Sequence, residues 1–128
     1  MRALPKTPGV WHKRPATLIS GDKSYRMKHK FVVISSPGPN RDPSKGTREQ
    51  PFWDEHEAFI DDLVDRGFIF MGGPLLDDAG LPSGALLIVN ADDENEVREN
   101  LKSDPWFERG ILKLGSVNHW EIFIDVRK

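Results

Sequence analysis

The chain has 128 residues, which suits one ordinary domain and leaves no room for two. It contains no cysteine, which excludes disulfide bonds, thiolate zinc sites and a cysteine nucleophile. The net charge of −2 is uneven, because residues 1–26 carry +5 and residues 27–128 carry −7. The acidic body argues against nucleic acid as a partner, since phosphate binding needs concentrated lysine and arginine.

The sequence predicts neither a membrane span nor a secretory signal. No apolar run approaches the roughly 18 residues needed to span a bilayer, and the first thirty residues lack the apolar core of a secretory signal. Together with the lack of cysteine, this leads us to expect a cytoplasmic protein with no membrane partner.

Residues 1–27 show neither helical nor strand periodicity and contain Pro5, Pro8 and Pro15. We expect a flexible basic N-terminal extension, followed by a domain over residues 28–128. A basic arm that binds a partner and an organelle presequence are the competing interpretations. A translation start upstream of the natural one is a further explanation, because Met27 directly precedes the first predicted strand.

The first strand is predicted at Phe31–Ile34, a run of strand-forming residues closed by Pro37-Gly38-Pro39. A long polar loop follows over residues 37–47, and loops of this length often carry function or move.

The first helix is predicted between Thr47 and Gly67. Thr47 and Gln50 have the spacing of a capping box, and Pro51 is tolerated in a first turn. Apolar side chains then recur at helical spacing along one face, and Gly67 ends the helix. The apolar positions are Phe52, Phe59, Ile60, Leu63 and Val64.

Two strands follow and are expected to pair as a hairpin. The first covers residues 68–71 and ends at Gly72-Gly73-Pro74, and the second covers residues 85–89. A short helix is predicted over residues 94–102, with Asp93 and Glu96 as its capping box.

The last helix is expected to end before Asp104-Pro105, which we predict to form a turn. The final strand is predicted over residues 116–126, with Trp120, Ile122, Ile124 and Val126 on one face by alternation.

The resulting order is β-α-β-β-α-β, which is typical of the α+β ferredoxin-like fold: an antiparallel sheet with two helices on one face. The other face of the sheet would meet water in an isolated subunit. We therefore expect a homodimer in which two sheets face each other.

His56 is the most informative candidate for chemistry. It lies four residues after Phe52 and four before Ile60, on the apolar stripe of the helix, where an imidazole needs a hydrogen-bond partner. Asp104 could be that partner and orient His56 as a general base. The competing interpretations are a core histidine bonded to a backbone carbonyl and an Asp-Pro pair that merely ends a helix.

Other candidates carry weaker signals. The amides of Gly72 and Gly73 could bind an oxyanion, although the glycines could also serve a sharp turn. His119 and Glu121 share one predicted strand face, but no third ligand stands at a recognisable spacing, so we predict no metal site. Dinucleotide, phosphate-loop and serine-nucleophile motifs are absent from the sequence.

These pieces resemble the YciI-like (YCII-related) family over residues 28–126. The resemblance is carried by the Glu-His-Glu-Ala-Phe sequence around His56, by Met71-Gly72-Gly73-Pro74, by residues 83–88 and by Asp104-Pro105-Trp106-Phe107. It implies a dimeric α+β barrel with a His–Asp pair in a pocket of each subunit. One branch of that family removes chloride from chlorinated hydroxyhydroquinones without a cofactor.

The resemblance places the catalytic pair at His56 and Asp104. We predict that the substrate-binding residues are Gly72, Gly73, Pro74 and Trp106. The leading hypothesis is a cofactor-independent dehydrohalogenase or isomerase that acts on a small aromatic or enolisable molecule. The alternatives are a non-catalytic dimeric module that binds a small ligand or a partner, and a cofactor-free monooxygenase.

Overall fold

The structure is a computed structural model that describes residues 28–127. The extension predicted over residues 1–27 lies outside the described residues. Among residues 28–127 no helix is long and apolar enough to cross a bilayer.

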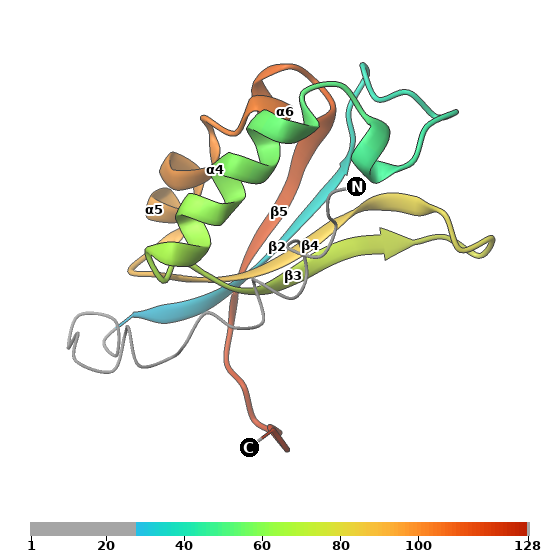
Figure 1. The fold of residues 1–128 in the computed structure, drawn as a ribbon. Helices are drawn as coiled ribbons and strands as arrows, with labels where there is room; N and C mark the ends of the chain where they lie inside the picture. Colours follow the sequence, from blue (N-terminus) through green and yellow to red (C-terminus); the bar gives the residue numbers. More distant parts are fainter. Residues whose placement is uncertain (1–27, 128) are drawn as a thin grey trace.

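In the described residues one antiparallel sheet forms the body, and the α-helices lie on one of its faces (Figure 1). The strands are β2 (His29–Pro37), β3 (Ile69–Leu76), β4 (Pro82–Ala91) and β5 (Leu112–Trp120), and they lie in the order β3-β4-β2-β5. The helices are the 3-10 helix η1 (Thr47–Glu49), α4 (Trp53–Asp65), α5 (Glu94–Leu101) and α6 (Pro105–Glu108). This confirms the predicted α+β ferredoxin-like arrangement, with the first and third strands in the centre of the sheet.

The core lies between the sheet and helices α4 and α5. Residues that alternate along the central strands meet the apolar stripes of the helices, as the sequence periodicity predicts. The buried cluster comprises Phe31, Val33, Leu63, Phe68, Val89, Ala91, Val97 and Leu101.

Helix α4 ends as predicted at Gly67, whose φ of 80° is the left-handed conformation that glycine adopts without steric cost. The Phe68 N–H bonds to the Leu63 carbonyl and the Gly67 N–H bonds to the Val64 carbonyl, both at 3.0 Å. This pair of bonds is the Schellman motif, which satisfies carbonyls at the end of the helix.

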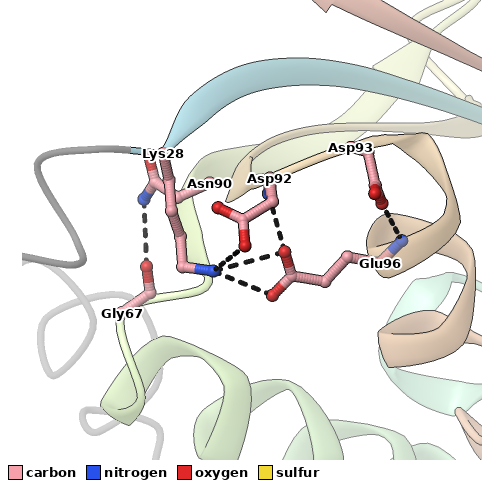
Figure 2. Close-up of polar contacts among 6 residues, drawn as sticks. All are labelled: Lys28, Gly67, Asn90, Asp92, Asp93 and Glu96. Carbon is pink, nitrogen blue, oxygen red and sulfur yellow. Dashed lines mark hydrogen bonds and ion pairs between the residues drawn. The ribbon is translucent and has the colours of Figure 1, made fainter.

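Asp93 caps α5 as predicted, because its side chain accepts a hydrogen bond from the Glu96 N–H at 2.8 Å (Figure 2). The Glu96 carboxylate returns to the Asp92 N–H at 2.6 Å, one residue before the position expected in a capping box. It also holds the Lys28 ammonium at 3.0 Å, while Asp92 lies 3.6 Å from the same nitrogen. These contacts tie the start of β2 to the start of α5.

Several predicted boundaries are wrong. The final strand β5 begins at Leu112 and ends at Trp120, so residues 121–126 lie outside the sheet. The first strand is longer than predicted and includes Pro37. Pro37 is tolerated because it pairs with Leu112 of an edge strand at the end of the ladder.

The start of α4 also differs from the prediction. Thr47 belongs to η1, and α4 begins only at Trp53, with no side-chain cap. Gln50 instead bonds to the preceding loop, and Phe52 turns the chain into the helix with a left-handed φ of 65°. A bulky residue in this conformation is strained, which indicates that the surroundings fix the entry to the helix.

Candidate active site

His56 lies in the first half of α4 and points to Asp104 at the start of α6. Its Nδ1 atom lies 2.9 Å from Asp104 Oδ1 and 3.0 Å from Oδ2. The His56 side chain is 13% exposed and that of Asp104 is 1% exposed. The structure therefore brings together the two residues that sequence analysis named as a catalytic pair.

Asp104 is the N-cap of α6, where its Oδ1 accepts a hydrogen bond from the Trp106 N–H at 2.9 Å. The turn predicted at Asp104-Pro105 is thus a short helix with Pro105 in its favoured first position. An ionised carboxylate only accepts hydrogen bonds, so this geometry fits an imidazole that carries its proton on Nδ1. No residue within 28–127 bonds to the second ring nitrogen of His56, Nε2.

Two tryptophans pack against the His56 imidazole and fix the orientation of its ring. Trp106 stacks on His56 with ring centroids 3.9 Å apart and an interplanar angle of 4°. Trp53 packs against both rings, at 5.7 Å from His56 and 5.6 Å from Trp106. The indole N–H of Trp106 donates to the Pro51 carbonyl at 2.8 Å, which anchors the stack to the start of α4. The ring of His56 is therefore fixed by contacts on its face and at its Nδ1 edge.

These residues line a cavity of about 510 Å³ between α4, α6, the β2–η1 loop and strands β3 and β4. All six predicted site residues lie in its wall: His56, Asp104, Gly72, Gly73, Pro74 and Trp106. Trp53 and Arg41 also line it, and neither was predicted from the sequence as a site residue. The only available signal for Arg41 was the unusual length of its polar loop.

The profile of the YCII-related domain matches residues 27–121. The chain belongs to the YCII-related domain family.

A solved structure with a similar fold is the 5-chloro-2-hydroxyhydroquinone dehydrochlorinase (TftG) from Burkholderia phenoliruptrix AC1100, in complex with 2,5-dihydroxybenzoquinone. The two chains are 25% identical, the match covers 72% of this chain and 93% of the other, and the TM-score is 0.56. No functionally curated protein matches the chain.

In this YCII-related domain, Gly72-Gly73-Pro74 lies inside strand β3 and does not end a strand as predicted. Neither glycine has a positive φ, so the alternative of a sharp glycine turn is also wrong. At Gly72 a Cβ would lie 2.5 Å from a side-chain methyl of Leu87 and 2.9 Å from the Leu86 carbonyl oxygen, whereas at Gly73 it would meet open space. Glycine at position 72 thus allows the two strands to approach closely.

Strand β3 lies at the edge of the sheet, which affects the amides of Gly72 and Gly73. Successive residues of an edge strand point their N–H groups alternately to the neighbouring strand and away from the sheet. One of these two amides therefore points out of the sheet, and both glycines line the cavity. Pro74 has no N–H and interrupts the row of donors.

His119, which the sequence analysis considered as a metal ligand, lies on β5 and packs against Phe31 and His29 at ring-centroid distances of 5.1 and 4.9 Å. Glu121 follows the end of that strand. Within the part of the chain that the structure describes, no group of three or more His, Asp or Glu side chains is arranged to hold a metal ion.

Proposed function

We propose that this protein is an enzyme that transfers protons on a small aromatic or enolisable molecule, with His56 as the general base. The observation that supports the proposal is the contact of His56 Nδ1 with the buried Asp104 carboxylate, at the wall of a cavity. Asp104 would hold the ring in the tautomer whose Nε2 lone pair is available to a substrate, and stabilise the imidazolium that forms.

The proposed chemistry needs no electron transfer. Nε2 of His56 takes a proton from a carbon next to a carbonyl group, and the electron pair of the broken C–H bond moves to the carbonyl oxygen, giving an enolate. The imidazolium then returns the proton to another carbon in an isomerisation. In a dehydrohalogenation, the enolate electrons instead re-form the carbonyl and make a new C=C bond, while the C–Cl bond on the carbon next to the deprotonated one breaks and chloride leaves. The imidazolium releases its proton to water, and the sum of the steps is loss of HCl. Because acid–base catalysis alone completes either cycle, we propose that no cofactor takes part.

Gly72, Gly73, Pro74 and Trp106 would form the remaining substrate contacts. The amide that points out of the edge strand would donate to the enolate oxygen, as donors in oxyanion holes do. Trp106 is 4% exposed and stacked on His56, so it would contact an aromatic substrate through the small part of its ring that reaches the cavity. The cavity of about 510 Å³ falls within the size range of small-molecule sites.

The similarity to a dehydrochlorinase supports this reaction class, because that protein acts on a small phenolic ring. At 25% identity the substrate itself does not follow. We therefore propose the class of reaction and leave the individual substrate to a screen.

Hydrogen–deuterium exchange into candidate substrates tests the proposal without knowledge of the full reaction. Cyclic diketones, hydroxyquinones and chlorinated hydroxyhydroquinones are incubated in D2O, and exchange at carbon and release of chloride are followed. We expect wild-type protein to accelerate exchange of at least one compound, and His56→Asn to lose about 100-fold or more of that rate. His119→Asn is the matched control, since this histidine lies outside the cavity. An equal loss in both variants, or exchange that is unaffected by His56→Asn, contradicts the proposal.

A non-catalytic binding module is the second candidate, and one observation favours it. Asp104 caps α6 and His56 stacks on Trp106, so the pair has a structural role even without catalysis. This candidate predicts that small aromatic ligands bind the wild type with no exchange and no turnover, and that His56→Asn keeps their affinity.

We also propose that the protein works as a homodimer. After β5 the chain extends away from the sheet and clear of the helices (Figure 1), and Phe123, Ile124 and Val126 on this segment are 85–87% exposed. Apolar side chains gathered on an exposed segment are typical of an interface. Light scattering should give the mass of two chains, and Phe123→Asp with Ile124→Asp should shift it towards one. A monomeric wild type would refute the dimer.

A further inference from the structure

Arg41 contributes a positive charge to the wall of the cavity that contains His56. It lies in the β2–η1 loop and is half-buried. We propose that Arg41 binds an anionic oxygen group of the substrate, so that the site selects small organic acids, such as carboxylates or ionised enols, over neutral molecules of the same shape. This inference deepens the proposed function, because it concerns the ligand of the same cavity.

Arg41 makes no hydrogen bond or ion pair through its side chain with any residue in the range 28–127. The acidic side chains in the cavity wall are Asp65 and Asp104, and Asp104 is already occupied by His56 and the Trp106 N–H. A half-buried guanidinium without a carboxylate is costly unless water or a ligand satisfies its donors. The side chain is therefore available to an anion that enters the cavity.

The adjacent carboxylate of Asp42 is directed elsewhere. It accepts hydrogen bonds from the Ser44 hydroxyl at 2.6 Å and the Ser44 N–H at 2.9 Å. These bonds lower the pKa of Asp42, while the nearby charges of Lys45 and Arg41 contribute less. Asp42 is thus held as an anion within its own turn, and none of its oxygens lies within ion-pair distance of Arg41.

The loop that carries Arg41 is fixed at both ends. The N–H groups of Gly38 and Asn40 bond to the carbonyls of Ile111 and Gly110, both at 2.8 Å. On the other side, the Gln50 side chain is buried and bonds to the backbone of Asp42 at 2.7 and 2.9 Å.

These bonds surround Arg41 in sequence, so its backbone is held in place before any ligand arrives. Preorganisation of this kind lowers the entropy cost of binding.

The chemistry of a guanidinium defines the class of ligand. Its planar set of N–H donors matches the two oxygens of a carboxylate or the adjacent oxygens of an ionised hydroxyquinone. The aromatic wall formed by Trp53 and Trp106 suits a flat ring. In combination, the cavity fits a planar organic anion whose charged group contacts Arg41 and whose reacting carbon faces His56.

The experiment compares matched pairs of an anion and its neutral analogue: benzoate with benzamide, salicylate with salicylamide, and phenylpyruvate with its methyl ester. Dissociation constants are measured by NMR titration for wild type, Arg41→Gln, Arg41→Lys and Arg48→Gln. Arg48 is the control, because it is an exposed arginine of η1 that does not line the cavity.

We expect the wild type to prefer at least one anion by about tenfold or more, as loss of a charge-assisted hydrogen bond would imply. Arg41→Gln should abolish this preference without changing the affinity for the neutral analogue. Arg41→Lys should keep part of it, and Arg48→Gln should keep all of it. If no pair favours the anion, or if Arg41→Gln keeps the preference, the inference is wrong.

This binding test is separate from the exchange assay. A preference for anions that depends on Arg41, with no exchange catalysed by wild type, supports the Arg41 site and removes the proton-transfer function. Exchange that depends on His56, with no preference for anions, supports the proton-transfer function and refutes the Arg41 site.

Discussion

Replacement of Asp104 by alanine should destabilise the fold more than loss of an ordinary helix cap. The carboxylate is 1% exposed and accepts hydrogen bonds from both His56 and the Trp106 N–H. Loss of the cap costs about 1 kcal/mol. Loss of a hydrogen bond to a charged group adds about 2 kcal/mol, because the imidazole N–H is left buried and unpaired. We therefore expect Asp104→Ala to lower the free energy of unfolding by about 3 kcal/mol.

Urea denaturation followed by circular dichroism measures this loss, and Asp93→Ala serves as the matched control. Asp93 also caps a helix, through its bond to the Glu96 N–H, but it is exposed and contacts no imidazole. Its replacement should cost about 1 kcal/mol, the usual value for a cap. The urea midpoint of Asp104→Ala should fall well below that of Asp93→Ala, with an unchanged slope. Equal losses for the two variants would show that the His56 contact adds nothing to stability.

Two further predictions concern stability away from the His–Asp pair. Partial burial opposes ionisation of Glu96, but the Asp92 N–H and the Lys28 ammonium outweigh it and lower the Glu96 pKa, so the stability that Glu96 contributes is present above its ordinary pKa and is lost as the pH falls through the lowered value. The loss of stability in Glu96→Gln, measured by urea denaturation, should therefore be seen at neutral pH and vanish in acid. A loss that persists in acid would contradict the assigned ion pair. In β3, Gly72→Ala should lower the free energy of unfolding by about 1–3 kcal/mol, because the added methyl meets the Leu86 carbonyl oxygen, whereas Gly73→Ala should stay within about 0.5 kcal/mol of wild type. Equal thermal stability of the two variants would refute the close approach of the strands at Gly72.

Local sequence signals located the elements whose ends are set by neighbouring residues. The apolar stripe of α4 placed His56 on the inward face, and Gly67 ended the helix because it adopts a left-handed φ. Asp93 capped α5 because its side chain accepts a hydrogen bond from the Glu96 N–H, three residues further along the chain. These features follow from backbone sterics and hydrogen bonding within a few residues, so periodicity and capping rules predict them.

Tertiary contacts decided the features that were predicted wrongly. Residues 121–126 alternate like a strand, yet the structure leaves them outside the sheet, because β5 pairs with β2 in a register that ends at Trp120. Gln50 had the spacing of a cap but bonds to a loop instead. Phe52 adopts a left-handed φ that no local preference of phenylalanine favours.

The candidate site was also predictable only in part. His56 and Asp104 are 48 positions apart, so no local pattern joins them. The sequence offered Asp104 as a candidate partner for an inward-facing imidazole, and the resemblance to a family supported that pairing. Arg41 was missed because the path of its loop is set by bonds to Gly110 and Ile111, far away in the sequence. A side chain on such a loop has no periodic pattern that would place it in a cavity.

The tautomer of His56 tests the central claim most directly. Nitrogen-15 NMR of the ring at mildly alkaline pH distinguishes a proton on Nδ1 from one on Nε2, and it is recorded for wild type and for Asp104→Asn. We predict that wild type carries the proton on Nδ1, facing Asp104, and that Asp104→Asn shifts it towards Nε2, because the asparagine amide can donate to Nδ1. A wild-type ring protonated on Nε2, or the same tautomer in both proteins, would contradict a base oriented by Asp104.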